Sequence, residues 1–212
     1  MKRMILVCLF SLAVPAANGL AADAPATRPA IDDADYGYRL ASRDGVELWW
    51  CESARKVGRS RPAPTEAAGD TVELSAARNE FEAVQLVVRP SKELAGLQVS
   101  TGDWVGTDGA VIPQRAIEVL RVAYVPVTVP TDQFGSPGEW PDPLPPLCPD
   151  GAGLDVPKDT NQPLWILIHV PEDATAGRYE GSIRLTADGW SAAVLLHLRV
   201  WDFTLPKVPH TR

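Results

Sequence analysis

Histidine and cysteine are scarce in this chain, which has only three of each among its 212 residues. Several motifs that carry chemistry are missing as well, namely the Gly-x-Ser-x-Gly nucleophile elbow, the glycine-rich phosphate loop and the Cys-x-x-Cys pair. Their absence argues against nucleophilic hydrolysis, phosphate binding and a zinc centre in this chain. We therefore expect no metal and no other cofactor.

Helical periodicity is also missing. No segment of ten or more residues has a convincing helical pattern, and the nearest candidate, residues 75–87, ends in β-branched residues just before Arg89-Pro90. The chain instead has 20 prolines, which interrupt helices, and seven tryptophans, which favour sheet surfaces. These counts indicate an all-β protein with many turns.

The N-terminus has the features of a secretory signal. Two basic residues precede a short apolar run over residues 5–14, and Pro15 ends this run before it is long enough to span a membrane. We predict a signal peptide over residues 1–21, cleaved near Ala21, and a secreted or periplasmic protein. Cys8 lies inside the apolar run without the preceding small residue that lipid attachment needs, so we expect no lipid anchor.

Removal of the signal leaves an acidic protein. Eighteen basic and 27 acidic residues remain, which gives a net charge of −9. Nucleic acids and anionic membranes attract basic surfaces. We therefore expect no nucleic-acid partner and no membrane association after cleavage.

Strand patterns fill the rest of the chain. In residues 177–187, Tyr179, Ile183 and Leu185 face one way and charged or polar residues the other, and Asp188-Gly189 then turns the chain into another alternating run. Such alternation is typical of antiparallel sheets with one face in water. Many short strands separated by turns predict an antiparallel, immunoglobulin-like β-sandwich. We place one domain at residues 39–205, after a linker over 22–38.

A few polar residues are weak candidates for chemistry. His169 and His197 fall on strands whose outer faces we predict to be adjacent, although strand histidines more often form ordinary hydrogen bonds than bind a metal. Glu80 and Glu82 share one face of a predicted strand and could flank a sugar, although a solvated edge is the commoner case. We assign neither pair a site.

Two cysteines, Cys51 and Cys148, remain after signal cleavage. An exported protein can form disulfides, so these two are a candidate pair. The alternative is two separate thiols, because the sequence does not show whether their Cα atoms lie within about 7 Å.

The most unusual segment covers residues 130–147, "PTDQFGSPGEWPDPLPPL". It contains six prolines, one tryptophan and several acidic residues. Long loops without regular structure are uncommon and are usually functional or disordered. We select Asp132, Phe134, Trp140 and Asp142 as candidate contacts for a sugar or a neighbouring domain, with simple packing of Trp140 on the sandwich as the alternative.

Long phrases in a fixed order carry a family resemblance. They include "LWWCESARKVGRSRPAP", "ELSAARNEFEAVQLVVRP", "RVAYVPVTVPTDQFGSPGEWPDPLPPL", "NQPLWILIHVPEDATAGRYEGSIRLTADG" and "LRVWDFTLPKVPH". Over residues 45–210 the chain resembles the N-terminal domain of glycoside hydrolase family 123-like proteins. The resemblance implies an exported bacterial enzyme in which a β-sandwich precedes a (β/α)8 barrel with β-N-acetylgalactosaminidase activity. The barrel of such enzymes carries an adjacent Asp-Glu pair, and the acetamido group of the substrate is the nucleophile.

The chain departs from this family pattern in one respect. It contains no Asp-Glu dipeptide, and residues 206–212 stand where the linker to the barrel would begin. We therefore expect no catalysis by this chain alone, and interpret it as a non-catalytic sandwich that supports or docks a catalytic barrel, with a glycan as a further candidate partner. The alternative is a stand-alone carbohydrate-binding or adhesion module, in which Trp49, Trp190 and Trp201 would form a flat aromatic face.

Overall fold

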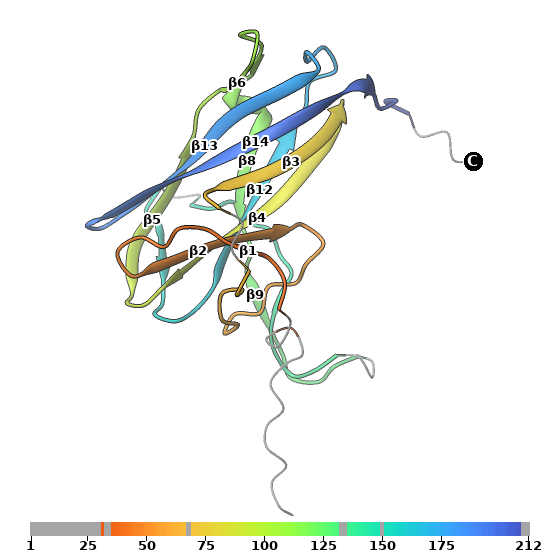
Figure 1. The fold of residues 1–212 in the computed structure, drawn as a ribbon. Coiled ribbons are helices and arrows are strands. Elements are labelled where there is room, and N and C mark those ends of the chain that lie inside the picture. Colours follow the sequence, from red (N-terminus) through yellow and green to blue (C-terminus); the bar gives the residue numbers. More distant parts are fainter. Residues whose placement is uncertain (1–30, 32–34, 67–68, 132–134, 149–150, 209–212) are drawn as a thin grey trace, which may run out of the picture.

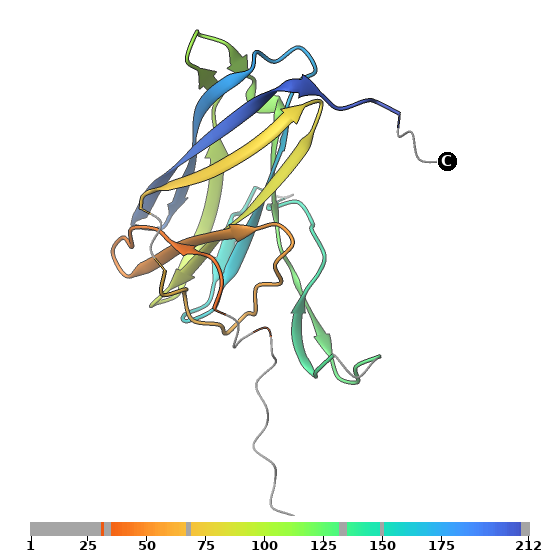
Figure 2. The same ribbon diagram turned by 45° about the vertical axis from the view of Figure 1, so that its right-hand side comes forward.

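The chain folds as two facing β-sheets (Figures 1 and 2). The structure is a computed structural model, and it describes residues 31, 35–66, 69–131, 135–148 and 151–208. Within these residues, the first sheet, called sheet A here, has the order β1 (Tyr38–Arg39), β2 (Val46–Glu52), β4 (Phe81–Pro90), β12 (Gln162–His169) and β8 (Ile117–Arg121). Sheet B has the order β11 (Leu154–Val156), β5 (Leu94–Thr101), β13 (Gly177–Ala187), β14 (Trp190–Thr204) and β3 (Thr71–Arg78), and the hairpin of β6 (Trp104–Gly106) and β7 (Val111–Ile112) joins it at β13. A separate hairpin is formed by β9 (Tyr124–Val127) and β10 (Gly138–Pro141).

The predicted immunoglobulin-like β-sandwich is confirmed, with one difference in strand direction. All described pairings are antiparallel except that of β14 with β3, which is parallel. In the described part of the chain, the longest helical element is the 3-10 turn Gln114–Ala116, and no helix is long and apolar enough to cross a bilayer.

The hairpin of β13 and β14 shows how alternation builds the core. Ala187 pairs with Trp190, so Asp188 and Gly189 form the two-residue turn that the sequence predicts. Gly189 has a φ of 68°, which a residue with a Cβ adopts only with strain. Inward residues of both strands join those of sheet A in the main core, which places the polar alternate residues on the outer face of sheet B.

A corner at Asn79 carries the chain from sheet B to sheet A. Its backbone is left-handed, with a φ of 61°, a conformation that asparagine tolerates better than most residues. The Asn79 amide N–H donates to the carbonyl of Val170, and its side chain donates to the carbonyl of Leu205. The corner therefore ties the ends of β3, β12 and β14 together.

A second, smaller core lies on the outer face of sheet A. Trp49, Cys51 and Val87 project away from the main core and are covered by the loop over residues 53–66, with Val57 packed among them. Gln85, also buried, fixes this loop by donating from its side-chain amide to the backbone carbonyls of Glu52, Ser53 and Arg55. Trp49 is thus fully buried although it lies on an outer face.

The N-terminal boundary of the sandwich differs from the predicted linker. Tyr38, placed in the linker by the sequence, belongs to β1, and its ring contacts Trp50 with 4.6 Å between ring centroids. Tyr36 lies over the guanidinium of the buried Arg61. Aromatic packing therefore extends the domain to residue 36, whereas the predicted signal peptide lies outside the described residues.

Candidate functional site

The proline-rich segment contains one short strand, β10 (Gly138–Pro141). Its middle part, β10, pairs with β9, so that Trp140 lies opposite Val125 and Pro141 opposite Tyr124. Figures 1 and 2 show this hairpin projecting from one end of the sandwich. β-branched valines in β9 favour the extended backbone, while Gly138 in β10 has a φ of 142°, which suits glycine.

The last part of the segment covers the edge of sheet A. The amides of Ala123 and Arg121 donate to the carbonyls of Pro143 and Pro145 at 2.9 and 3.2 Å. Proline has no backbone N–H group, so these residues cannot donate hydrogen bonds to a further strand on their solvent side. This run therefore covers the free edge of β8, the last strand of sheet A, and its own solvent side does not readily pair with another strand.

Two of the four candidate residues lie on this hairpin. Trp140 is half-buried, and its indole N–H donates to the carbonyl of Ser136 at 2.7 Å, which fixes the ring against the hairpin. The Asp142 carboxylate is exposed and forms an ion pair with Lys56 at 3.3 Å. Asp132 and Phe134 lie outside the described residues.

The loop over residues 53–66 clamps the base of the hairpin. Lys56 donates to the carbonyl of Pro141 at 3.1 Å, and Arg59 pairs with Glu139 at 2.8 Å. The Tyr124 hydroxyl donates to the carbonyl of Val57 at 3.0 Å. Several weak contacts together thus hold the direction of the hairpin, although each exposed ion pair contributes only about 0–1 kcal/mol. Sequence reasoning missed Lys56 and Arg59, because no local pattern shows which acidic residues a basic loop will meet.

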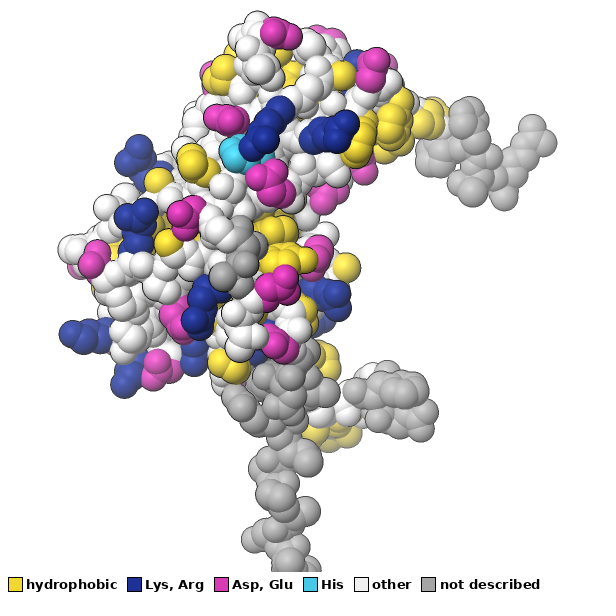
Figure 3. All heavy atoms as spheres, in the orientation of Figure 1, with side chains coloured by type: hydrophobic (Ala, Val, Ile, Leu, Met, Phe, Trp, Pro, Cys, Tyr) yellow, Lys and Arg dark blue, Asp and Glu magenta, His cyan; other side chains and the backbone are white. Residues whose placement is uncertain are grey.

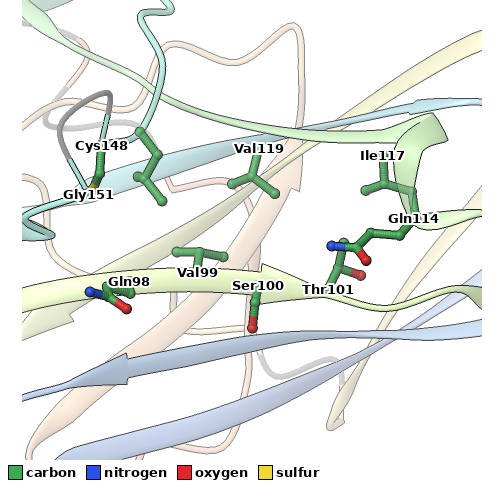
Figure 4. A pocket seen from close by; sticks show the side chains of 10 residues that line it. Gln98, Val99, Ser100, Thr101, Gln114, Ile117, Val119, Cys148 and Gly151 are labelled. Atoms are coloured by element: carbon green, nitrogen blue, oxygen red, sulfur yellow. The ribbon is translucent and has the colours of Figure 1, made fainter.

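Two cavities adjoin these elements. The first, of about 240 Å³, lies under the hairpin base between the loop and the outer face of sheet A, where Trp165, Val122 and Leu144 form apolar walls. The second, of about 430 Å³, opens between β5 and β8 at the side of the sandwich. Figure 4 shows Gln114 and Thr101 at one end of this second cavity and Cys148 at the other.

Both cysteines are free, so the structure has the second of the two alternatives that the sequence left open, two separate thiols. Cys51 is buried beneath the loop on the outer face of sheet A, whereas Cys148 lines the cavity at the side of the sandwich. Burial, with a smaller effect of the neighbouring Glu52, raises the pKa of the Cys51 thiol to about 12. Cys51 is therefore a protonated core residue at neutral pH.

The two histidines are not neighbours, which corrects their predicted placement. His169 is on β12 in sheet A and stacks on Phe81 with 4.3 Å between ring centroids. His197 is on β14 in sheet B, and its Nδ1 lies 2.7 Å from a Glu73 carboxylate oxygen. Among the described residues, no group of three or more His, Cys, Asp or Glu side chains is placed to hold a metal.

The two glutamates do not form a strand-face pair either. Glu80 lies in the corner before β4, where its carboxylate accepts a hydrogen bond from the Ala77 amide at 2.5 Å. Glu82 is on β4, and its pKa is raised by partial burial and, to a lesser extent, by Glu80. Glu80 thus has a structural role in the corner.

The predicted aromatic face does not form. Trp49 is 0% exposed and Trp190 is 8% exposed, and the indole of Trp190 donates to the carbonyl of Arg43. Of these three tryptophans, Trp201 alone is substantially exposed, at 39%, and the Arg199 guanidinium lies 4.1 Å from its ring centroid.

Comparisons with known proteins bear on this architecture. Residues 50–187 match the family described as glycoside hydrolase 123 N-terminal domain, and no curated protein sequence matches significantly. Among solved structures, a family 123 glycoside hydrolase from Clostridium perfringens, studied for glycolipid glycan hydrolysis, is similar with a TM-score of 0.57 and 20% identity. The alignment covers 65% of this chain and 24% of that chain, so the chain spans about a quarter of the hydrolase's length.

A weaker structural match is to a pilin. The CooA pilin subunit from enterotoxigenic Escherichia coli has a TM-score of 0.36 and 15% identity, over 75% of this chain and 99% of that chain. The family match, in contrast, covers most of the sandwich, including β4, β12 and the proline-rich hairpin. The predicted resemblance is thus confirmed, and the chain belongs to the family of glycoside hydrolase 123 N-terminal domains.

Proposed function

We propose that this chain is the non-catalytic N-terminal β-sandwich of an exported glycoside hydrolase, and that it supports a (β/α)8 catalytic barrel acting on N-acetylgalactosamine-type glycans. Family membership supports the accessory role. The barrel, the substrate and export follow from the family resemblance and from the signal-like N-terminus.

The observation that carries a docking role is the clamped hairpin. A projecting element that is already ordered loses less conformational entropy when a second domain packs against it. Here prolines restrict the backbone, Trp140 is held by Ser136, and Lys56 and Arg59 fix the base. We propose that the hairpin contacts the catalytic domain near the rim of its active site.

The test is Trp140→Ala in the full-length hydrolase polypeptide. We expect the protein to stay folded and its turnover of a chromogenic β-N-acetylgalactosaminide to fall by roughly tenfold, because displacing a positioning element by about 1 Å can cost up to a hundredfold. Leu195→Ala, which removes an exposed apolar side chain from the outer face of sheet B, is the control and should keep wild-type turnover. Wild-type turnover in both variants would contradict the proposed role of the hairpin.

A carbohydrate-binding module is the second candidate function, and one observation favours it. A groove of about 600 Å³ on the outer face of sheet B is lined by Trp201, Arg178 and Glu73, a combination of aromatic and charged groups that suits a sugar. Titration of the chain with an N-acetylgalactosamine-containing oligosaccharide, followed through the Trp201 indole N–H signal, tests this function. Saturable shifts that Arg178→Ala abolishes would support it, and unchanged spectra would exclude it.

A further inference from the structure

The outer faces of the two sheets differ in chemistry. Sheet B presents charged and polar side chains across its strands, with Glu180 opposite His197 and His197 opposite Glu73. Figure 3 shows acidic and basic side chains interspersed on this side of the molecule. A face of this kind is suited to water.

The outer face of sheet A is largely apolar. On β12, Leu164, Ile166 and Ile168 enter the main core, yet the alternate residues Trp165 and Leu167 are apolar too. A strand that is apolar on both faces is typical of sheets covered on both sides. The composition of β12 therefore indicates a second covering layer over sheet A.

The structure supplies only part of that layer. The loop over residues 53–66 covers the side of the face that carries Trp49, Cys51 and Val87. Most of the remaining outward residues form a surface, called the sheet A strip here, that consists of Phe81, Ala83, Leu120, Trp165, Leu167 and His169, and the exposed Glu118, which pairs with Leu167, borders it.

Strand register brings these residues together. Phe81 is paired with His169, Ala83 with Leu167, and Trp165 with Leu120. Phe81 is 64% exposed although it stacks on His169, so most of an aromatic side chain faces solvent at this position, and Leu120, Trp165 and Leu167 are partly exposed. Contiguous exposed apolar surface on a soluble protein generally marks an interaction site.

The strip connects two other features of the domain. At one end, Trp165 lines the cavity under the hairpin base together with Leu144 and Asp142. At the other end, the Leu205 amide donates to the carbonyl of Arg78 in the corner that leads to Phe81. Phe203 and Val208, which flank Leu205, are also exposed, so any polypeptide that continues beyond residue 208 begins beside the strip.

We infer that the sheet A strip is the surface on which the catalytic domain of the hydrolase packs, whereas the outer face of sheet B stays in water. This inference rests on the proposed function. The occupant is a second domain rather than a short peptide, since the related hydrolase chain is about four times as long as the part that this chain matches. The interface is dry and apolar, with the hairpin extending it at one end.

Hydroxyl-radical footprinting tests the inference by comparing the full-length hydrolase polypeptide with the present chain. Phe81, Trp165 and Leu167 should be oxidised several-fold more slowly in the full-length protein, because a domain packed on the strip would exclude the dissolved radical from these side chains. Leu195 is the internal control, because it is 52% exposed on the outer face of sheet B and should react at the same rate in both.

Three other results of the footprinting experiment would overturn the inference, and each of them would lead to a different conclusion about the docking surface or its occupant. Protection of Leu195 and its neighbours, with the strip unprotected, would mean that the catalytic domain docks on sheet B, which leaves the proposed function intact. Protection of neither face would overturn the inference alone, because the proposed contact of the hairpin is tested separately by Trp140→Ala. Concentration-dependent protection of the strip in the present chain alone would identify a second copy as the occupant.

A pair of matched variants tests the same surface independently. Phe81→Glu places a charge on the strip without disturbing the core, because the native side chain is mostly exposed, and Leu195→Glu places the same charge on sheet B. In the full-length protein, Phe81→Glu should speed proteolysis between the domains by about tenfold, since burial of one phenyl ring is lost. The control should leave the rate unchanged, and equal rates in both variants would overturn the inference.

Discussion

Gly181 lies on β13 directly against the indole of Trp104, which is fully buried. A Cβ atom at this position would come within 2.3 Å of the indole carbons Cγ, Cδ1 and Cδ2. The ring cannot move away easily because its N–H donates to the Thr101 hydroxyl and the main core surrounds it. We expect Gly181→Ala to lower the free energy of unfolding by about 1–3 kcal/mol, which urea denaturation measures.

Gly102→Ala is the matched control for this prediction. Nothing lies within 4 Å of a Cβ at Gly102, so the substitution should change the stability by less than about 0.5 kcal/mol. Wild-type stability of Gly181→Ala would show that the close packing of Trp104 on the strand is not required.

Cys51 makes the stability of the domain depend on pH above the neutral range. Burial raises the pKa of its thiol to about 12, whereas in the unfolded chain the thiol ionises near 9.0. Between these values the unfolded state has lost a proton that the folded state keeps, so the free energy of unfolding falls as the pH rises through this window and is unaffected below it.

The pH dependence is measured by urea denaturation at several pH values between 8 and 10. Cys51→Ala should be less stable at every pH, because it leaves a cavity, but should show a smaller decline as the pH rises. Cys148→Ala should keep the wild-type decline, since Cys148 lies at the open side of the sandwich. An identical decline in all three proteins would contradict the assignment to Cys51.

Local patterns were sufficient to predict the hairpin of β13 and β14. Asp188-Gly189 stands between alternating runs and occupies the turn of this hairpin in the structure. Such turns are encoded within a few residues. The parallel pairing of β3 with β14 was not predicted, because residues more than a hundred positions apart meet there and no local pattern specifies their register.

The proline-rich segment shows a different limit of sequence reasoning. Its composition correctly marked it as unusual, and Trp140 and Asp142 do lie on a projecting element. Its prolines concealed the pairing of β10 with β9, because proline normally argues against a strand. The pattern of β12, in contrast, was visible: "PLWILIH" is apolar on both faces, which indicates a covered strand, whereas we predicted a polar outer face.

The outer face of sheet B is suited to water, whereas the outer face of sheet A carries the uncovered sheet A strip. This difference should affect how the chain behaves on its own. Exposed single apolar residues are normal on soluble proteins, whereas contiguous apolar patches bind hydrophobic probes and promote association. We expect the isolated chain to enhance the fluorescence of an anilinonaphthalene sulfonate dye and to associate as its concentration rises. Phe81→Ser should remove most of both effects, because it breaks the strip at its most exposed residue. Leu195→Ser removes a similarly exposed side chain from polar surroundings and should change neither the dye fluorescence nor the association. Equal losses in the two variants would show that exposure alone, and not the contiguity of the sheet A strip, governs association.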